Sequence, residues 1–188
     1  MTNDIGVREK ISFRLAQLAD LEKIESIVQA AYRGGQATVD WKNENHLVQG
    51  PRVDRLGLEK ILTDSKKHLL VAESDSTILA CVLAELEEDG VVAIGMIAVD
   101  PAKQNLGLGR LLVQAGENEA RTSFHAHVGR MYVVSCRDEL IGWYGRQNYL
   151  DTGKTAPFPE GEDTGLSLLK KGIYFRILEK NLTLSGNS

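Results

Sequence analysis

Cysteine is scarce in this chain, and its scarcity argues against a scaffold held together by disulfides. Cys81 and Cys136 are the only two among 188 residues, and no C-x-x-C pair occurs. Small secreted domains that depend on disulfides carry more cysteines, whereas two isolated ones fit a reducing compartment. We therefore expect free thiols and a cytoplasmic protein.

Long apolar runs and basic clusters are also missing. Residues 1–10 are polar and lack the apolar core of a signal peptide, and no run approaches the length of a membrane span. The formal net charge is −4, and no stretch rich in lysine and arginine occurs. We therefore expect neither a nucleic acid nor a membrane as a partner.

Internal repeats and low-complexity segments are absent, and the remaining composition suits one globular domain. Hydrophobic residues make up 43% of the chain and charged residues 26%, which are ordinary values. A chain of 188 residues is long enough for one sizeable core. We expect a flexible N-terminal lead over residues 1–10, a single domain over residues 11–180 and a polar tail over residues 181–188.

The spacing of apolar residues predicts the order of strands and helices. Helices are expected over residues 21–33, 56–62, 109–123 and 140–149, and strands over residues 11–15, 68–73, 78–86, 91–99, 131–134 and 173–178. Turn residues at Asp75-Ser76 and Asp89-Gly90 predict that the strands between residues 68 and 99 form an antiparallel meander. The polar or glycine-bearing stretches 34–54 and 151–165 are expected to be loops.

One stretch predicts an anion-binding site. An apolar strand stops at Asp100-Pro101, and a helical pattern starts at Gly107 and Gly109. The first N–H groups of a helix lack partners within it and lie at the positive end of its dipole, and glycine allows a ligand to approach closely. The stretch is therefore a candidate cradle for phosphate or pyrophosphate. Neither G-x-x-x-x-G-K-[ST] nor G-x-G-x-x-G occurs, which excludes the nucleotide P-loop and the dinucleotide fingerprint.

Two motifs resemble those of a known superfamily. Gln104-x-x-Gly107-x-Gly109, after a strand ending in Val99-Asp100-Pro101, resembles the acetyl-CoA signature of the GCN5-related N-acetyltransferases (GNAT). Trp143-Tyr144 followed by Asn148-Tyr149 is similar to the L-Y-x-x-x-G-F end of the family's closing helix. The resemblance implies an α/β (α+β) fold, with a mixed, mostly antiparallel central sheet of six to seven strands flanked by about four helices.

The resemblance implies acetyl-CoA as a co-substrate and assigns residues to it. In the family, backbone N–H groups of the glycine turn bind the pyrophosphate, and the strand before the turn pairs with the pantetheine arm because its neighbouring strand splays away. The cofactor-binding residues expected on this basis are Ile97, Ala98, Val99, Gln104, Asn105, Leu106, Gly107, Leu108, Gly109 and Arg110. Arg137 stands where the family often has an asparagine that contacts the cofactor, so that contact is not carried over.

The implied reaction is transfer of the acetyl group to a primary amine by direct attack on the thioester. Tyr144 holds the place of the family's general acid, which protonates the departing thiolate. The family often has a glutamate base on the strand before the turn, but Ile94-Gly95-Met96 provides no carboxylate. The alternatives for the base are Glu85, Glu73, His68 and His46, and a water chain or an acceptor whose amine has a low pKa would need no dedicated base. No metal is expected, because His125 and His127 lack nearby residues that would complete a ligand set.

The acceptor side is the least determined part of the site. By resemblance, the segment around the first two helices lines it, so Tyr32, Trp41, His46 and Arg52 are candidates for acceptor contact, with simple packing as the other interpretation. The acceptor is a small-molecule amine or a peptide. Homodimers are common in this fold, and the sequence does not fix the oligomeric state. Two alternatives stay open: a non-catalytic module that binds acyl-CoA, and a larger acyl donor whose carboxylate pairs with Arg137 or Arg52.

Overall fold

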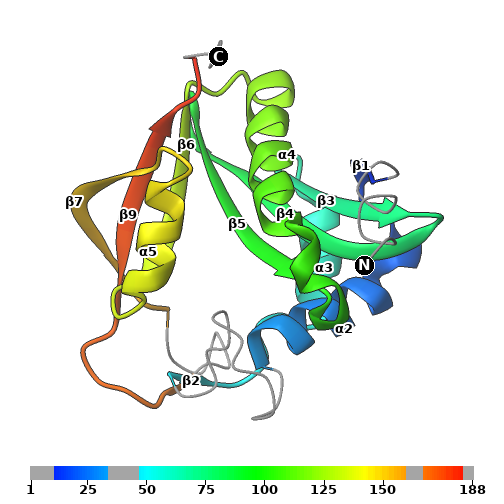
Figure 1. Cartoon of the computed structure of the whole chain (residues 1–188), viewed down its shortest axis with the longest axis horizontal. Helices are drawn as coiled ribbons and strands as arrows, with labels where there is room; N and C mark the ends of the chain where they lie inside the picture. The colour runs from blue at the N-terminus through cyan, green and yellow to red at the C-terminus, as the bar shows by residue number, and fades with distance from the viewer. Residues whose placement is uncertain (1–10, 34–46, 160–166, 184–188) are drawn as a thin grey trace.

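A mixed seven-stranded sheet forms the centre of the structure, a computed structural model that describes residues 11–33, 47–159 and 167–183 (Figure 1). The strands lie in the order β1-β3-β4-β5-β6-β9-β7, and one pair, β5–β6, is parallel while the other pairs are antiparallel. Their bounds are β1 (Ser12–Leu15), β3 (Lys67–Ser74), β4 (Thr77–Glu88), β5 (Val91–Val99), β6 (Val128–Val134), β7 (Leu150–Pro157) and β9 (Tyr174–Asn181). The expected fold class is confirmed.

Helices cover both faces of the sheet. Helices α2 (Leu21–Arg33) and α3 (Arg55–Thr63) lie behind it in Figure 1, and α4 (Leu108–Ser123) and α5 (Asp138–Gly145) lie in front. The apolar positions of α2 pack with one face of β3 to β5, whereas those of α4 pack with the other face. Two 3₁₀ turns, η1 (Leu18–Asp20) and η2 (Pro101–Leu106), precede α2 and α4. The sheet therefore separates two apolar clusters.

The expected meander of β3, β4 and β5 is confirmed, and turn chemistry accounts for it. Asp75 and Ser76 both have positive φ (48° and 62°), as the tight turn between two twisted antiparallel strands requires. Gly90 has φ 73° in the turn between β4 and β5. A side chain at Gly90 would start 1.9 Å from the ring of His127, so glycine is required there for space as well as for conformation.

Strands β5 and β6 separate soon after they meet. They pair only where Val91–Ala93 faces Val128–Arg130, which confirms the expected divergence of these neighbours. From Ile94 to Val99, β5 has no described strand on that side. The register of β4 with β5 moves from Leu83 opposite Gly95 to Cys81 opposite Ala98, so two β5 residues face Val82 in a bulge. Met96 in this bulge has φ 45°, which is uncommon for a residue with a side chain.

Several boundaries differ from the sequence expectation. The expected loop over residues 151–165 is wrong for its first part, because β7 occupies Leu150–Pro157. This strand lies at the edge of the sheet, is largely exposed and contains Gly153 with φ 73°, so its composition resembles that of a loop. The short strands β2 (Val48–Gln49) and β8 (Ser167–Leu168) pair with each other and were not expected.

Two helix ends also differ from the expectation, and the last strand extends further than expected. Helix α4 begins at Leu108, one residue before the expected start, and α5 ends at Gly145 rather than at residue 149. Strand β9 reaches Asn181, and the next residue, Leu182, is buried in the core. In the described part of the chain, no helix has the length and apolar character needed to cross a membrane.

Candidate active site

A cavity of about 520 Å³ lies between the diverging strands β5 and β6 and extends toward α2. We call it the β5–β6 cavity. Its walls come from α2, β4, β5, β6, α5, β7 and β9, so segments far apart in the sequence meet there. The residues that line it are Tyr32, Arg33, Arg52, Leu83, Glu85, Glu87, Ala93, Ile94, Gly95, Met96, Ile97, Met131, Tyr132, Val133, Val134, Leu140, Tyr144, Ala156, Pro157, Phe158, Pro159 and Phe175. Enclosed by both halves of the sheet, it is the natural place for a ligand.

The edge of β5 is the polar wall of this cavity. Because no described strand pairs with β5 beyond Ala93 on that side, this edge is open to an extended ligand. Gly95 lies on this wall, and a Cβ added there would meet no atom within 4 Å. The bulge at Met96 turns the backbone at the same point, and strained conformations of this kind concentrate at functional sites.

The glycine turn joins this edge to α4. Asp100 caps η2, since its carboxylate accepts a hydrogen bond from the N–H of Ala102 at 3.0 Å. Gly107 then adopts φ 69° and forms the N-cap of α4, so the first N–H groups of the helix are left without intrahelical partners. The side chains of residues 104–106 lie outside the described part. The turn has the geometry of an anion cradle, which fits a pyrophosphate.

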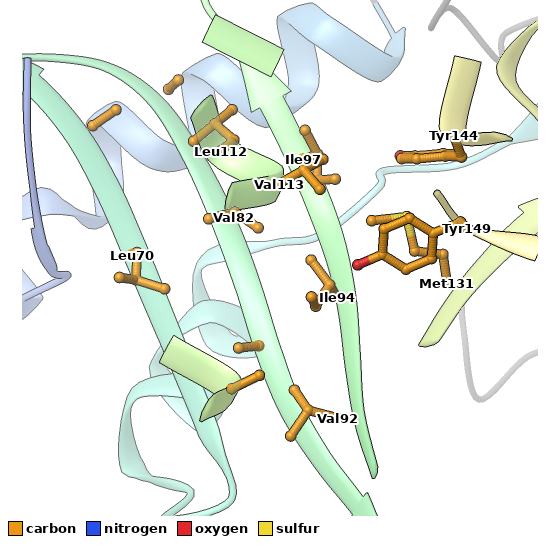
Figure 2. Close-up of a cluster of buried hydrophobic side chains, with 14 of the residues drawn as sticks. Leu70, Val82, Val92, Ile94, Ile97, Leu112, Val113, Met131, Tyr144 and Tyr149 are labelled. Atoms are coloured by element: carbon orange, nitrogen blue, oxygen red, sulfur yellow. The ribbon is translucent and has the colours of Figure 1, made fainter. Parts of the chain in front are cut away.

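Tyr144 faces the β5 edge from the opposite side of the cavity. It lies on α5, is 9% exposed and packs edge-to-face with Trp143 and Tyr149 at ring-centroid distances of 5.0 and 6.1 Å. Figure 2 shows its ring pointing across toward Ile97 on β5. Asn148 has φ 68°, which confirms that this residue takes the left-handed position after the helix. The fold thus directs the Tyr144 hydroxyl at the expected pantetheine wall.

Tyr149 belongs to the core beside this site. Its ring is 1% exposed, and burial among apolar neighbours raises the pKa of its hydroxyl well above the usual range. Figure 2 places the ring near Ile94 and Met131, at the point where β5 and β6 begin to diverge. Tyr149 therefore supports Tyr144 by packing and stays protonated at ordinary pH.

Two of the four expected acceptor contacts lie in the cavity. Tyr32 donates a hydrogen bond from its hydroxyl to the carbonyl of Ile97 at 3.2 Å, and the Arg52 guanidinium lies 5.2 Å from the centre of the Tyr32 ring. The other two, Trp41 and His46, lie outside the described residues. The structure therefore brings Arg52, in the segment between β2 and α3, onto Tyr32 of α2 in the same cavity, although the two are 20 positions apart.

The four residues considered as the general base do not share one location. Glu85 lines the cavity, and its carboxylate lies 3.0 Å from Lys67 Nζ at a partly exposed position. Glu73 instead pairs with Arg14 at 2.9 Å, and His68 pairs with Glu119 at 2.5 Å beside Phe124. Neither of these two is among the residues that line the cavity. His46, the fourth, is not among the described residues.

Arg137 occupies the start of α5 and is unusually buried for an arginine, with 4% exposure. Its Nε donates to Glu139 Oε1 at 2.6 Å, whereas its Nη1 is buried and has no hydrogen-bond partner among the described groups. A buried donor without a partner is costly. Nη1 could satisfy an acceptor of a bound ligand at this place, but Arg137 is not part of the cavity wall.

Several wall residues were not foreseen from the sequence. Glu87 lines the cavity next to Glu85, and Phe158 stacks on Phe175 with centroids 4.9 Å apart. The alternation of Leu83, Glu85 and Glu87 along one strand was the available signal, because residues two apart share a face. No such signal existed for Phe158 and Phe175, which meet only because β7 pairs with β9.

Comparison with known proteins agrees with this geometry. The model of the acetyltransferase (GNAT) family matches residues 25–149, which confirms the resemblance and the enzyme class expected from the two motifs. No curated protein sequence matches this chain.

Three solved structures illustrate the shared fold. yncA from Salmonella typhimurium, solved with its cofactor acetyl-CoA, is 20% identical with a TM-score of 0.63, over 94% of this chain and 96% of that one. Spermidine N-acetyltransferase from Vibrio cholerae, in complex with CoA and spermine, is 14% identical with a TM-score of 0.66, over 93% and 97%. The ribosomal-protein-S18-alanine N-acetyltransferase from Escherichia coli is 15% identical with a TM-score of 0.66, over 95% and 97%.

Proposed function

Because the chain belongs to the acetyltransferase (GNAT) family, we propose that it transfers the acetyl group of acetyl-CoA to a primary amine held in the β5–β6 cavity. The observation that carries this proposal is the open edge of β5. It runs from the cavity to the glycine turn at α4, with Tyr144 directed at it from α5. A single extended co-substrate can therefore contact the turn at one end and the tyrosine at the other.

The placement of acetyl-CoA follows from these elements. The N–H groups of the turn over residues 104–110 hold the pyrophosphate, as the dipole of α4 favours negative charge there. The pantetheine arm lies along Ile97, Ala98 and Val99 and pairs with their backbone groups as a strand would. The thioester then reaches the bulge at Met96, where a backbone N–H that does not point at β4 stabilises the carbonyl oxygen as it gains charge.

The chain's own residues carry the two proton transfers. The amine nitrogen bonds to the thioester carbonyl carbon while the carbon–sulfur bond breaks, and the departing thiolate takes the hydroxyl proton of Tyr144. The proton that the amine loses passes to Glu85, directly or through one water. Glu85 is suited to this role because it lines the cavity from β4, next to the part of β5 that has no carboxylate. Tyr144 then takes up a proton from solvent, and Glu85 releases its proton to solvent.

Binding and turnover can be tested separately. Calorimetry with acetyl-CoA on the folded protein should show binding, and an assay for free thiol should show CoA release when a primary amine is added. No measurable binding at high micromolar protein would contradict the proposal. Binding without turnover across a broad amine library would instead favour a non-catalytic module, for which the missing β5 carboxylate is the supporting observation.

A further inference from the structure

We propose that the acceptor is an amino acid: a primary amine that carries a carboxylate, bound by Arg52, and an apolar side group, packed against Phe158 and Phe175. This inference rests on the proposed acetyl transfer. It goes further by assigning the acceptor's chemical class from the charges that the β5–β6 cavity leaves unneutralised.

The carboxylates of the cavity already have cationic partners. Glu85 is paired with Lys67 at 3.0 Å. Glu87 accepts hydrogen bonds from Arg130 Nη1 and from the Tyr132 hydroxyl, both at 2.8 Å. Arg130 itself is held by a second carboxylate, that of Glu179, at 2.7 Å. A cationic group on an acceptor would therefore compete with existing partners on this side of the cavity.

Arg52 is in the opposite situation. Its guanidinium lies over the ring of Tyr32, and within residues 11–33, 47–159 and 167–183 it pairs with no carboxylate. Its backbone N–H donates to Gln29 Oε1 at 3.4 Å, and Gln29 Nε2 in turn donates to the carbonyl of Val53 at 2.6 Å. The arginine is thus fixed at the cavity wall with its planar group available, and a guanidinium binds carboxylates in two-point fashion.

The position of Arg52 fits an acceptor rather than a distant surface ion. Its stacking partner Tyr32 is tied by its hydroxyl to the carbonyl of Ile97, on the strand expected to hold the pantetheine arm. A carboxylate on Arg52 would therefore lie near the thioester, on the same molecule as an amine a few bonds away. A polyamine has no group that this arginine could bind and would be repelled by it.

The remaining wall selects an apolar side group. Phe158 from the end of β7 stacks on Phe175 of β9, and both face the cavity together with Met131, Val133 and Leu140. Tyr132 packs edge-on against Phe175 at 6.1 Å. The side chains of Phe158, Phe175, Val133 and Leu140 offer no charge or hydrogen bond to a polar substituent, whereas an apolar substituent gains by leaving water. The cavity therefore combines the Arg52 guanidinium with an apolar wall.

The test compares matched acceptors in the thiol-release assay. Leucine, methionine and phenylalanine are each paired with their amide and with the amine that lacks the carboxylate, and spermidine is included. We expect kcat/KM for the acids to exceed that for the other two forms by about ten- to a hundredfold, the worth of a charge-assisted hydrogen bond pair. Arg52→Gln should remove this preference by lowering kcat/KM for the acids toward that for the amides. Arg55→Gln, on the adjacent helix and paired with Glu59, is the matched control.

The outcomes separate this inference from the proposed function. Equal turnover of acids and amides, a preference for spermidine, or an acid preference that survives in Arg52→Gln would overturn the amino-acid assignment while acetyl transfer stands. A preference for succinyl-CoA over acetyl-CoA that disappears in Arg52→Gln would also overturn it, because the arginine would then bind the acyl donor. Acetyl-CoA binding without turnover of any of these amines overturns the assignment, and failure to bind acetyl-CoA removes the proposed function itself.

Discussion

The hydroxyl of Tyr32 on α2 donates a hydrogen bond to the backbone carbonyl of Ile97 on β5, with 3.2 Å between the two oxygens. This bond fixes the first helix against the strand edge that has no described neighbour beyond Ala93. The same tyrosine ring supports the Arg52 guanidinium. One side chain therefore links the expected acceptor side to the expected co-substrate side.

Removal of this bond should cost a modest amount of stability. Tyr32→Phe keeps the ring and its contact with Arg52 but removes the hydrogen bond to Ile97, worth about 1 kcal/mol in the free energy of unfolding. Chemical denaturation monitored by circular dichroism measures it. Tyr174→Phe serves as the control, because Tyr174 is 44% exposed and its side chain is not in the cavity. Equal stability of Tyr32→Phe and wild type would show that the bond is not formed in solution.

Tyr144→Phe should separate catalysis from binding. The hydroxyl is the proposed proton donor, whereas the ring packs against Trp143 and Tyr149 and is preserved in phenylalanine. We expect kcat to fall roughly 10²-fold or more, as for loss of a general acid, with the acetyl-CoA dissociation constant nearly unchanged. Stopped-flow or steady-state thiol release gives kcat, and calorimetry gives the affinity. An unchanged kcat would mean that the thiolate obtains its proton elsewhere.

Gly109→Glu should abolish acetyl-CoA binding. Gly109 lies in the first turn of α4, where the added carboxylate would occupy the expected pyrophosphate site and repel its charge. Asn118→Glu adds the same charge on an exposed position of the same helix and should leave affinity close to that of wild type. Circular dichroism should show that both variants are folded. Wild-type affinity in a folded Gly109→Glu protein would place the cofactor elsewhere.

Asp20 should contribute stability that is lost in acid. Arg14 donates two hydrogen bonds to its carboxylate, at 2.6 and 3.1 Å, and holds the pKa of Asp20 below its usual value. A carboxyl whose pKa is lower in the folded state stabilises the fold above its unfolded pKa of about 3.9, and this contribution disappears as the pH falls through the folded pKa.

Asp20→Asn should therefore lower the free energy of unfolding at neutral pH by about 1–2 kcal/mol, from loss of charge-assisted bonds. The difference from wild type should shrink as the pH is lowered through 4 and toward 3. Urea titrations at several pH values measure it, and Asp89→Asn, in the exposed turn before Gly90, is the control. A difference that does not change with pH would show that Asp20 is not stabilised as a carboxylate.

The structural features that depend on neighbouring residues in the sequence were the most predictable. The meander, the helix at Leu21–Arg33 and the left-handed Asn148 follow from residues near one another, and the structure confirms them. Strand β7 was missed because an edge strand needs neither alternation nor burial and tolerates Gly153 and Pro157. Its identity as a strand depends on hydrogen bonds to β9, which local composition does not encode.

The sequence by itself determined the family, the glycine turn and the tyrosine of the closing helix, because each depends on a few residues at fixed spacing. Only the tertiary structure decided which carboxylate faces the cavity and which arginine there lacks a carboxylate partner among the described residues. Glu85, Glu73 and His68 are equivalent candidates along the chain, but the sheet directs only Glu85 into the cavity. The pairing of Glu85 with Lys67, and of Glu87 with Arg130, depends on strands brought together by folding, so the charge left to a ligand is a property of the fold.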